Sequence, residues 1–119
     1  RYLADRVRLP GEGGAIRVRD LMDHTPGLED RALGQLFERE ARRVRPLDLY
    51  LRQERPDIVR PPSRVSSYSN YGVALAGSAL AHLGGRTFER RVEDEILVPL
   101  GMSHTTFREP RPERLGLPA

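Results

Sequence analysis

The sequence predicts a mainly α-helical chain with four or five helices and little or no sheet. The strongest observation is a window without Asp, Glu, Arg or Lys, residues 65–85, in a chain whose composition is 31% charged. The second half of this window is apolar on nearly every side, which is typical of a buried helix. Elsewhere, apolar residues recur at steps of three and four, the spacing of one helix face. The only strand we expect is a short one at residues 105–107.

The first third of the chain is expected to hold two helices. Residues 1–9 are interpreted as the end of an element, followed by a glycine-rich turn. A short helix is predicted at about 18–24, and Thr25-Pro26-Gly27 ends it because proline removes a donor and glycine permits positive φ. A second helix is predicted from about residue 31 to residue 44, from its apolar spacing.

The middle of the chain contains a third short helix and the central helix. Pro46 can begin the third helix, and Pro56 ends it. Residues 56–66 carry three prolines and are expected to form an extended loop. The charge-free window then predicts the central helix at 70–84.

Both ends of the central helix carry local signals. Ser69 or Asn70 can serve as its N-cap, and Gly84-Gly85 is a suitable stop. Tyr68 and Asn70, two residues apart, therefore lie at the mouth of a rigid helix. Taken alone, the triplet Tyr68-Ser69-Asn70 also fits a simple capping loop in which the Tyr68 side chain fills a gap in the packing.

The last helix is predicted at about 88–98. Thr87 is a suitable N-cap, and Glu89 lies near the positive end of the helix dipole. Pro99 to Gly101 should terminate it. Its expected buried stripe consists of Phe88, Val92, Ile96 and Leu97.

The charge pattern argues against a nucleic-acid partner. The net charge is +3, and all 20 basic residues are arginine because the chain has no lysine. The arginines are interspersed with acidic residues, as in residues 38–43 and 52–55. Mixed charge of this kind is typical of a solvated face, so we expect no nucleic acid among the partners.

Composition also argues against a metal or cofactor site and against a membrane span. Cysteine is absent, so thiolate ligands and disulfides are excluded. His24, His82 and His104 are far apart in sequence and lack paired metal-ligand spacing. His82 is interpreted as a core or helix-end residue. The apolar run at 71–83 is shorter than the ~20 residues that a bilayer span requires.

Three motifs occur in a recognisable order. They are Arg17–Leu28 (RVRDLMDHTPGL), Ser67–Gly72 (SYSNYG) and Ile96–Phe107 (ILVPLGMSHTTF). This order resembles the serine hydrolases of the class C β-lactamase type, which include D-alanyl-D-alanine peptidases and related esterases. The resemblance extends over roughly residues 1–108. It implies that residues 1–119 form a single partial domain, the helical part of an α+β β-lactamase/transpeptidase-like fold.

The resemblance assigns roles to two residues. Tyr68 matches the family's catalytic tyrosine, a general base and acid, and Asn70 matches its substrate-binding asparagine. A free phenol has a pKa of about 10, and the family places lysines nearby that favour the phenolate. An amide can donate to an acyl carbonyl and accept from an ammonium group at once. Ser69, between them, is expected to act as a cap.

Two other motifs of the family do not occur in these 119 residues. The family's nucleophile lies in an upstream Ser-x-x-Lys, and a Lys-Thr-Gly-like strand lies downstream; a chain without lysine contains neither. We therefore expect the chain to be a fragment that is inactive alone.

Two turns also depart from the family pattern. Pro26 replaces a usual serine, and Pro62-Ser63 replaces a usual Pro-Gly. Both departures concern the shape of the backbone more than the chemistry. His24, in the first of these turns, is interpreted as structural.

The leading functional hypothesis is a serine hydrolase that acts through an acyl-enzyme on a β-lactam, a D-Ala-D-Ala peptide or a simple ester. The alternative is a catalytically inactive family member that serves as a binding module. A basic helical nucleic-acid binder is a third hypothesis, which the uncharged central helix disfavours. The resemblance allows a periplasmic, extracellular or membrane-anchored location. It leaves membrane anchoring and oligomeric state open.

Overall fold

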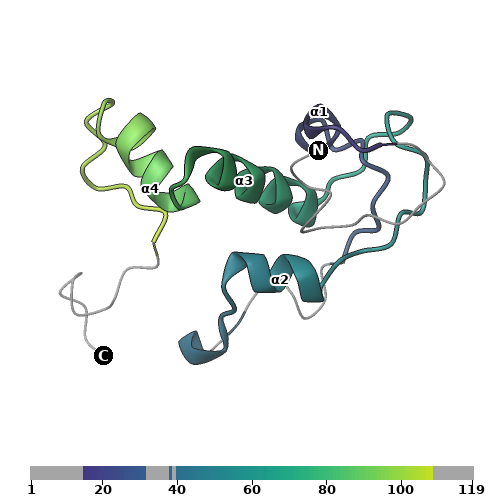
Figure 1. Ribbon diagram of the computed structural model, residues 1–119, viewed down its shortest axis with the longest axis horizontal. Coiled ribbons are helices and arrows are strands. Elements are labelled where there is room, and N and C mark those ends of the chain that lie inside the picture. The colour runs from purple at the N-terminus through teal and green to yellow at the C-terminus, as the bar shows by residue number, and fades with distance from the viewer. Residues whose placement is uncertain (1–14, 32–37, 39, 109–119) are drawn as a thin grey trace. The chain divides into compact units, whose positions relative to one another are not determined.

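The computed structural model describes residues 15–31, 38 and 40–108 (Figure 1). The chain divides into two compact units, residues 1–79 and 80–119, and each is described by itself. The elements expected at residues 1–14 lie outside the described residues. So does half of the helix expected at 31–44; the described part contains only a 3₁₀ turn, Ala41–Arg43.

The described residues are mainly helical, as predicted. They contain α1 (Val18–Met22), α2 (Leu47–Gln53), α3 (Asn70–Gly84) and α4 (Phe88–Val92), and a π-helical turn continues α4. Within this part of the chain, β pairing is limited to one isolated antiparallel bridge, between Leu28 and Ile58. None of these described helices has the length and apolar character needed to cross a membrane.

The core of the first unit forms on one face of α3. Its buried residues come from α1, α2, α3 and the segment after α1; they are Leu21, Leu28, Leu51, Tyr71, Leu75 and Ala76. The expectation that α3 is buried on all sides is wrong for the described residues, since Val73 on its other face is 43% exposed. The physical reason is size: α1 and α2, of 5 and 7 residues, cannot surround a helix of 15.

Two loop segments of the first unit, residues 23–29 and 57–69, run antiparallel to each other. Backbone N–H groups of the second segment donate to carbonyls of the first: Val59 to Gly27 (2.9 Å), Ser63 to Thr25 (2.8 Å) and Ser67 to His24 (2.7 Å). At Glu29 the first segment becomes the donor: the N–H of Glu29 donates to the carbonyl of Asp57 at 2.8 Å. The loop that precedes α3 is therefore held by the turn that follows α1.

Gly27 allows the closest approach in this pairing. Its φ is +76°, and a Cβ at this position would lie 2.0 Å from the carbonyl oxygen of Arg60. A side chain here is excluded by both the left-handed backbone and the neighbouring peptide.

In the second unit, α4 begins as predicted but continues differently. Thr87 caps it, because its Oγ1 accepts from the N–H of Arg90 at 3.3 Å. Residues Glu93–Leu97 then form a π-helical turn, in which residues five apart share a face. Val92 and Leu97 are therefore buried together, whereas Ile96 is 48% exposed. The prediction that Ile96 belongs to the buried stripe is wrong, because it assumed a period of 3.6.

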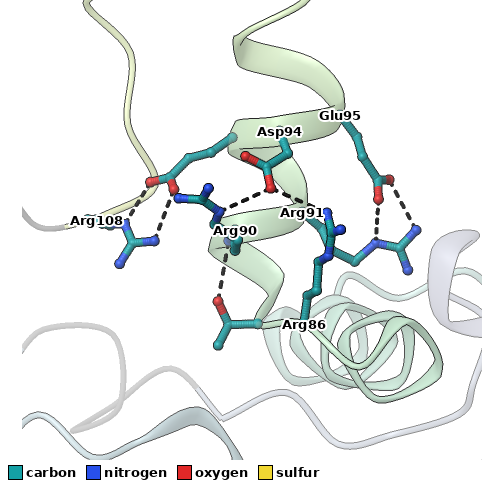
Figure 2. A network of polar contacts seen from close by, with 8 residues as sticks. Arg86, Arg90, Arg91, Asp94, Glu95 and Arg108 are labelled. Atoms are coloured by element: carbon teal, nitrogen blue, oxygen red, sulfur yellow. Dashed lines mark hydrogen bonds and ion pairs between the residues drawn. The ribbon is translucent and has the colours of Figure 1, made fainter.

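Ion pairs run along α4 and the π turn (Figure 2). Arg90 and Arg91 each pair with the acid four residues later, Asp94 and Glu95, at 3.0 Å. Arg108 binds both carboxylate oxygens of Glu93, at 2.6 and 2.9 Å. Acids and arginines are interspersed here as they are at residues 38–43 and 52–55.

The tail beyond Met102 contains no strand at residues 105–107, where one was predicted; residues 105 and 106 are irregular there, and residue 107 lies in a bend. Phe107 instead packs its ring edge-on against Phe88, with ring centroids 5.4 Å apart. Side-chain packing, rather than a ladder partner, holds this segment.

Candidate active site

Tyr68 and Asn70, the two residues predicted to form the site, are in contact. The Tyr68 hydroxyl donates a hydrogen bond to the Asn70 Oδ1 at 3.1 Å. Tyr68 lies in the loop before α3 and is 61% exposed, and Asn70 is the first residue of the helix. The arrangement presents a phenol and an amide side by side at the surface, on a backbone that α3 fixes.

Ser69 holds the backbone between them. Its Oγ accepts from the N–H of Gly72 at 3.1 Å, the geometry of an N-cap, and the residue is only 2% exposed. Of the two predicted caps, the structure therefore selects Ser69. With Ser69 directed inward, Tyr68 and Asn70 remain free to face solvent.

Tyr71 lies three residues after Tyr68 in a very different environment. It is 6% exposed, and its hydroxyl donates to the carbonyl of Leu51 at 2.7 Å. Burial raises the pKa of Tyr71 to about 12. Tyr71 therefore acts in packing α3 against α2, whereas Tyr68 is the accessible phenol.

His24 contacts the same loop, which the sequence did not reveal. Its Nδ1 accepts from the N–H of Ser69 at 3.2 Å, and its ring lies 4.6 Å from that of Tyr68, centroid to centroid. His24 has a φ of +56°. The structural role expected for His24 is therefore to support the loop before α3 that carries Tyr68. The available signal was its place in the HTPG motif.

Asp20 is a second residue that the sequence reasoning missed. It is 2% exposed, and its carboxylate accepts from Ser63 Oγ at 2.5 Å, Arg17 N at 2.8 Å and Thr25 Oγ1 at 3.5 Å. The hydrogen bond from Ser63, followed by that from the Arg17 backbone, lowers the pKa of Asp20 despite burial. The available signal was an acid at the third position of a predicted helix, which reaches back to the N-cap.

Ser63 itself occupies a left-handed backbone, with φ +61°. This is the turn where Pro62-Ser63 departs from the Pro-Gly of the resembled family. The backbone keeps the shape that suits glycine, and the serine hydroxyl adds a bond to Asp20.

The remaining histidines lie in the second unit. His82 is in the last turn of α3, which confirms the prediction of a helix-end residue. His104 is exposed in the tail. Among the described residues, no three His, Cys, Asp or Glu side chains are grouped so that they could hold a metal ion.

The family model for β-lactamase matches residues 1–118, nearly the whole chain. The chain belongs to the β-lactamase family. In structure it is similar to a β-lactamase/D-alanine carboxypeptidase from Yersinia pestis, determined with citrate. That match has a TM-score of 0.66 and 25% identity, and covers 98% of this chain and 39% of the other.

A curated relative also matches this β-lactamase-family chain. It is the β-lactamase-like protein 2 of Dictyostelium discoideum, 38% identical over 50 residues, which are 42% of this chain and 9% of that protein. The chain thus spans well under half of the proteins it matches. These comparisons confirm the resemblance to β-lactamase-related serine hydrolases and the helical part of that fold.

Proposed function

We propose that the protein containing this chain is a serine hydrolase that acts through an acyl-enzyme on an ester or amide. Tyr68 serves as general base and acid, and Asn70 binds the acyl group. β-Lactams and peptides ending in D-alanine are the first substrates to test, because the similar solved structure carries both names. The nucleophilic serine and its lysine belong to parts of the protein outside these 119 residues.

The observation that carries this proposal is the hydrogen bond between Tyr68 and Asn70. The Tyr68 hydroxyl lies 3.1 Å from the Asn70 Oδ1. The backbone between them is held by Ser69, the N-cap of α3. Preorganised polar groups of this kind are effective because they need little rearrangement during the reaction. A merely structural tyrosine in this position is expected to be buried, as Tyr71 is, and not 61% exposed as Tyr68 is.

The chemistry assigned to each residue follows from its atoms. The Tyr68 oxygen takes the proton of the attacking serine hydroxyl and returns a proton to the leaving group. A second transfer activates the water that releases the acyl group. The Asn70 side chain carries a donor and an acceptor, so its Nδ2 can donate to the substrate carbonyl while its Oδ1 holds a cation or the phenol.

The experiment compares two tyrosines that lie three residues apart, one in the loop and one in α3. In the full-length protein, Tyr68→Phe is expected to lower kcat/KM by about 100- to 10,000-fold, the usual contribution of general acid–base catalysis, with little change in Tm. Tyr71→Phe is the matched control, which should lower Tm and leave turnover per folded molecule near the wild-type value. Nitrocefin, p-nitrophenyl acetate and a D-Ala-D-Ala peptide serve as substrates.

The outcomes separate enzyme from binding module. Asn70→Ala is expected to reduce acylation, measured by mass spectrometry as a covalent adduct with a β-lactam. If the wild-type protein forms no adduct and turns over none of the three substrates, the inactive binding module is the better description. Full activity in Tyr68→Phe would remove Tyr68 from the mechanism.

A further inference from the structure

We propose that His24 is a positioning residue for Tyr68, and that it acts only while its ring is neutral. This rests on the proposed function, because it concerns the group that moves the proton there. His24 does not touch the substrate in this proposal. It holds the backbone on both sides of Tyr68.

The geometry gives His24 three contacts with one loop. Its carbonyl oxygen accepts from the N–H of Ser67 at 2.7 Å, and its Nδ1 accepts from the N–H of Ser69 at 3.2 Å. These amides belong to the residues immediately before and after Tyr68. The imidazole then lies against the phenol ring, with centroids 4.6 Å apart and planes inclined by 36°. The position of Tyr68 is therefore fixed from two sides and from its face.

The backbone of His24 shows that the contact requires an unusual conformation. Its φ of +56° lies in the left-handed region, which is unfavourable for a residue with a Cβ. The turn keeps this conformation because two of its neighbours are bonded across to the second loop: Thr25 accepts from Ser63 N at 2.8 Å, and Asp23 accepts from Ser66 Oγ at 3.3 Å.

The proton on the ring decides whether the link exists. A ring nitrogen accepts a hydrogen bond only when it carries no proton, so Nδ1 must be bare and Nε2 must hold the hydrogen. In the doubly protonated ring, an Nδ1–H faces the N–H of Ser69, and the bond is lost. Among the described residues, the titratable group in contact with the His24 ring is Tyr68, and Asp20 and Asp23 precede His24 on its own segment. The Asp20 carboxylate is already engaged with Ser63, Thr25 and Arg17.

Three variants of the full-length protein separate the parts of this role. His24→Asn keeps an acceptor near the position of Nδ1 and tolerates positive φ, but it cannot titrate. His24→Phe keeps a ring and removes the acceptor. His24→Ala removes both while keeping a Cβ in the left-handed backbone.

The expected result is a loss in kcat rather than in KM. His24→Ala and His24→Phe should lower kcat by about 10- to 100-fold, since a displacement of about 1 Å at a catalytic group can cost ~100-fold. His24→Asn should recover most of that loss at neutral pH. It should also lack the part of the acidic decline in kcat/KM that protonation of His24 causes in the wild type.

Two results would overturn the proposal. The first is that His24→Asn is as impaired as His24→Ala. The second is that all three variants lower Tm but keep wild-type kcat per folded molecule.

A measurement without substrate distinguishes failure of this proposal from failure of the proposed function. Long-range ¹H–¹⁵N spectra of the histidine rings should show His24 with Nε2 protonated and Nδ1 bare at neutral pH. The Ser69 amide should shift when the ring is protonated. The opposite tautomer, or a Ser69 amide that does not respond, contradicts the positioning role whether or not the protein is active. If the tautomer is as expected but Tyr68→Phe is fully active, the proposed function fails and the His24 link to the loop stands.

Discussion

The hydroxyl of Ser63 donates to the carboxylate of Asp20 at 2.5 Å, and it joins two residues 43 positions apart. Asp20 ends the first turn of α1, and Ser63 lies in a left-handed turn of the loop that leads to Tyr68. The bond therefore connects the first helix to the loop that carries the candidate site. It stabilises the fold most while the carboxylate is charged, because hydrogen bonds to a charged acceptor are the stronger ones.

Two substitutions at Ser63 separate its hydrogen bond from its backbone strain. Ser63→Ala loses a bond to a charged group, worth about 1.5–3 kcal/mol, and keeps the positive φ. Ser63→Gly loses the same bond but relieves the left-handed strain, so it should be about 1 kcal/mol more stable than Ser63→Ala. Urea denaturation measures both. Equal stability of the two variants would show that the turn is not strained.

The same bond predicts a dependence on pH. The pKa of Asp20 is lowered in the folded state, chiefly by Ser63. The unfolded chain therefore binds more protons, and this stabilisation is present above the ordinary Asp value of about 3.9 and is lost as pH falls through the folded value. The stability difference between wild type and Ser63→Ala should stay constant above about pH 5 and shrink as the pH falls below the ordinary Asp value of about 3.9. A difference that stays constant below that value would contradict the assigned cause.

Tyr71 predicts the opposite behaviour at alkaline pH. Burial raises its pKa to about 12, so its contribution is complete below the ordinary value of about 10 and is lost as pH rises through the folded value. At pH 7, Tyr71→Phe should cost about 1–3 kcal/mol, because the buried carbonyl of Leu51 loses its donor. The gap between wild type and variant should narrow above pH 10, measured by denaturation at each pH.

Gly27→Ala should be strongly destabilising, by at least about 2 kcal/mol. The new Cβ meets both a positive φ and the Arg60 carbonyl oxygen, 2.0 Å away. Gly101→Ala is the matched control, because its φ is +66° and its Cβ meets nothing within 4 Å. The control should lose only the strain of about 1–2 kcal/mol. Similar melting temperatures for the two variants would mean that the paired loops can move apart to accommodate the new Cβ.

The π turn predicts which of two adjacent residues, Ile96 or Leu97, contributes more to the stability of the fold. Leu97→Ala should cost about 2–5 kcal/mol as a buried large-to-small change, since Leu97 is 7% exposed. Ile96→Ala, at a position 48% exposed, should cost well under 1 kcal/mol. Urea denaturation of the two variants is the measurement, and the reverse order would indicate an ordinary α-helical register.

Local signals in the sequence were sufficient for most of the described helices. Pro46 is the N-cap of α2, which runs from Leu47 to Gln53. The charge-free window predicts α3 at the bounds it has, 70–84. These elements could be predicted because capping, proline geometry and glycine at a helix end act within a few residues. The motif order was likewise sufficient for the family, which the match to residues 1–118 confirms.

Only the tertiary structure decided what surrounds the predicted site residues. The spacing of Tyr68 and Asn70 placed them together, but nothing nearby in sequence indicates that His24 Nδ1 accepts from Ser69, 45 positions later. The pairing of Ser63 with Asp20 and the register that buries Leu97 instead of Ile96 are of the same kind. Each depends on where distant segments meet or on how a helix is wound against its neighbours. Such contacts are selected by packing of the whole unit, which no local pattern of residue types encodes.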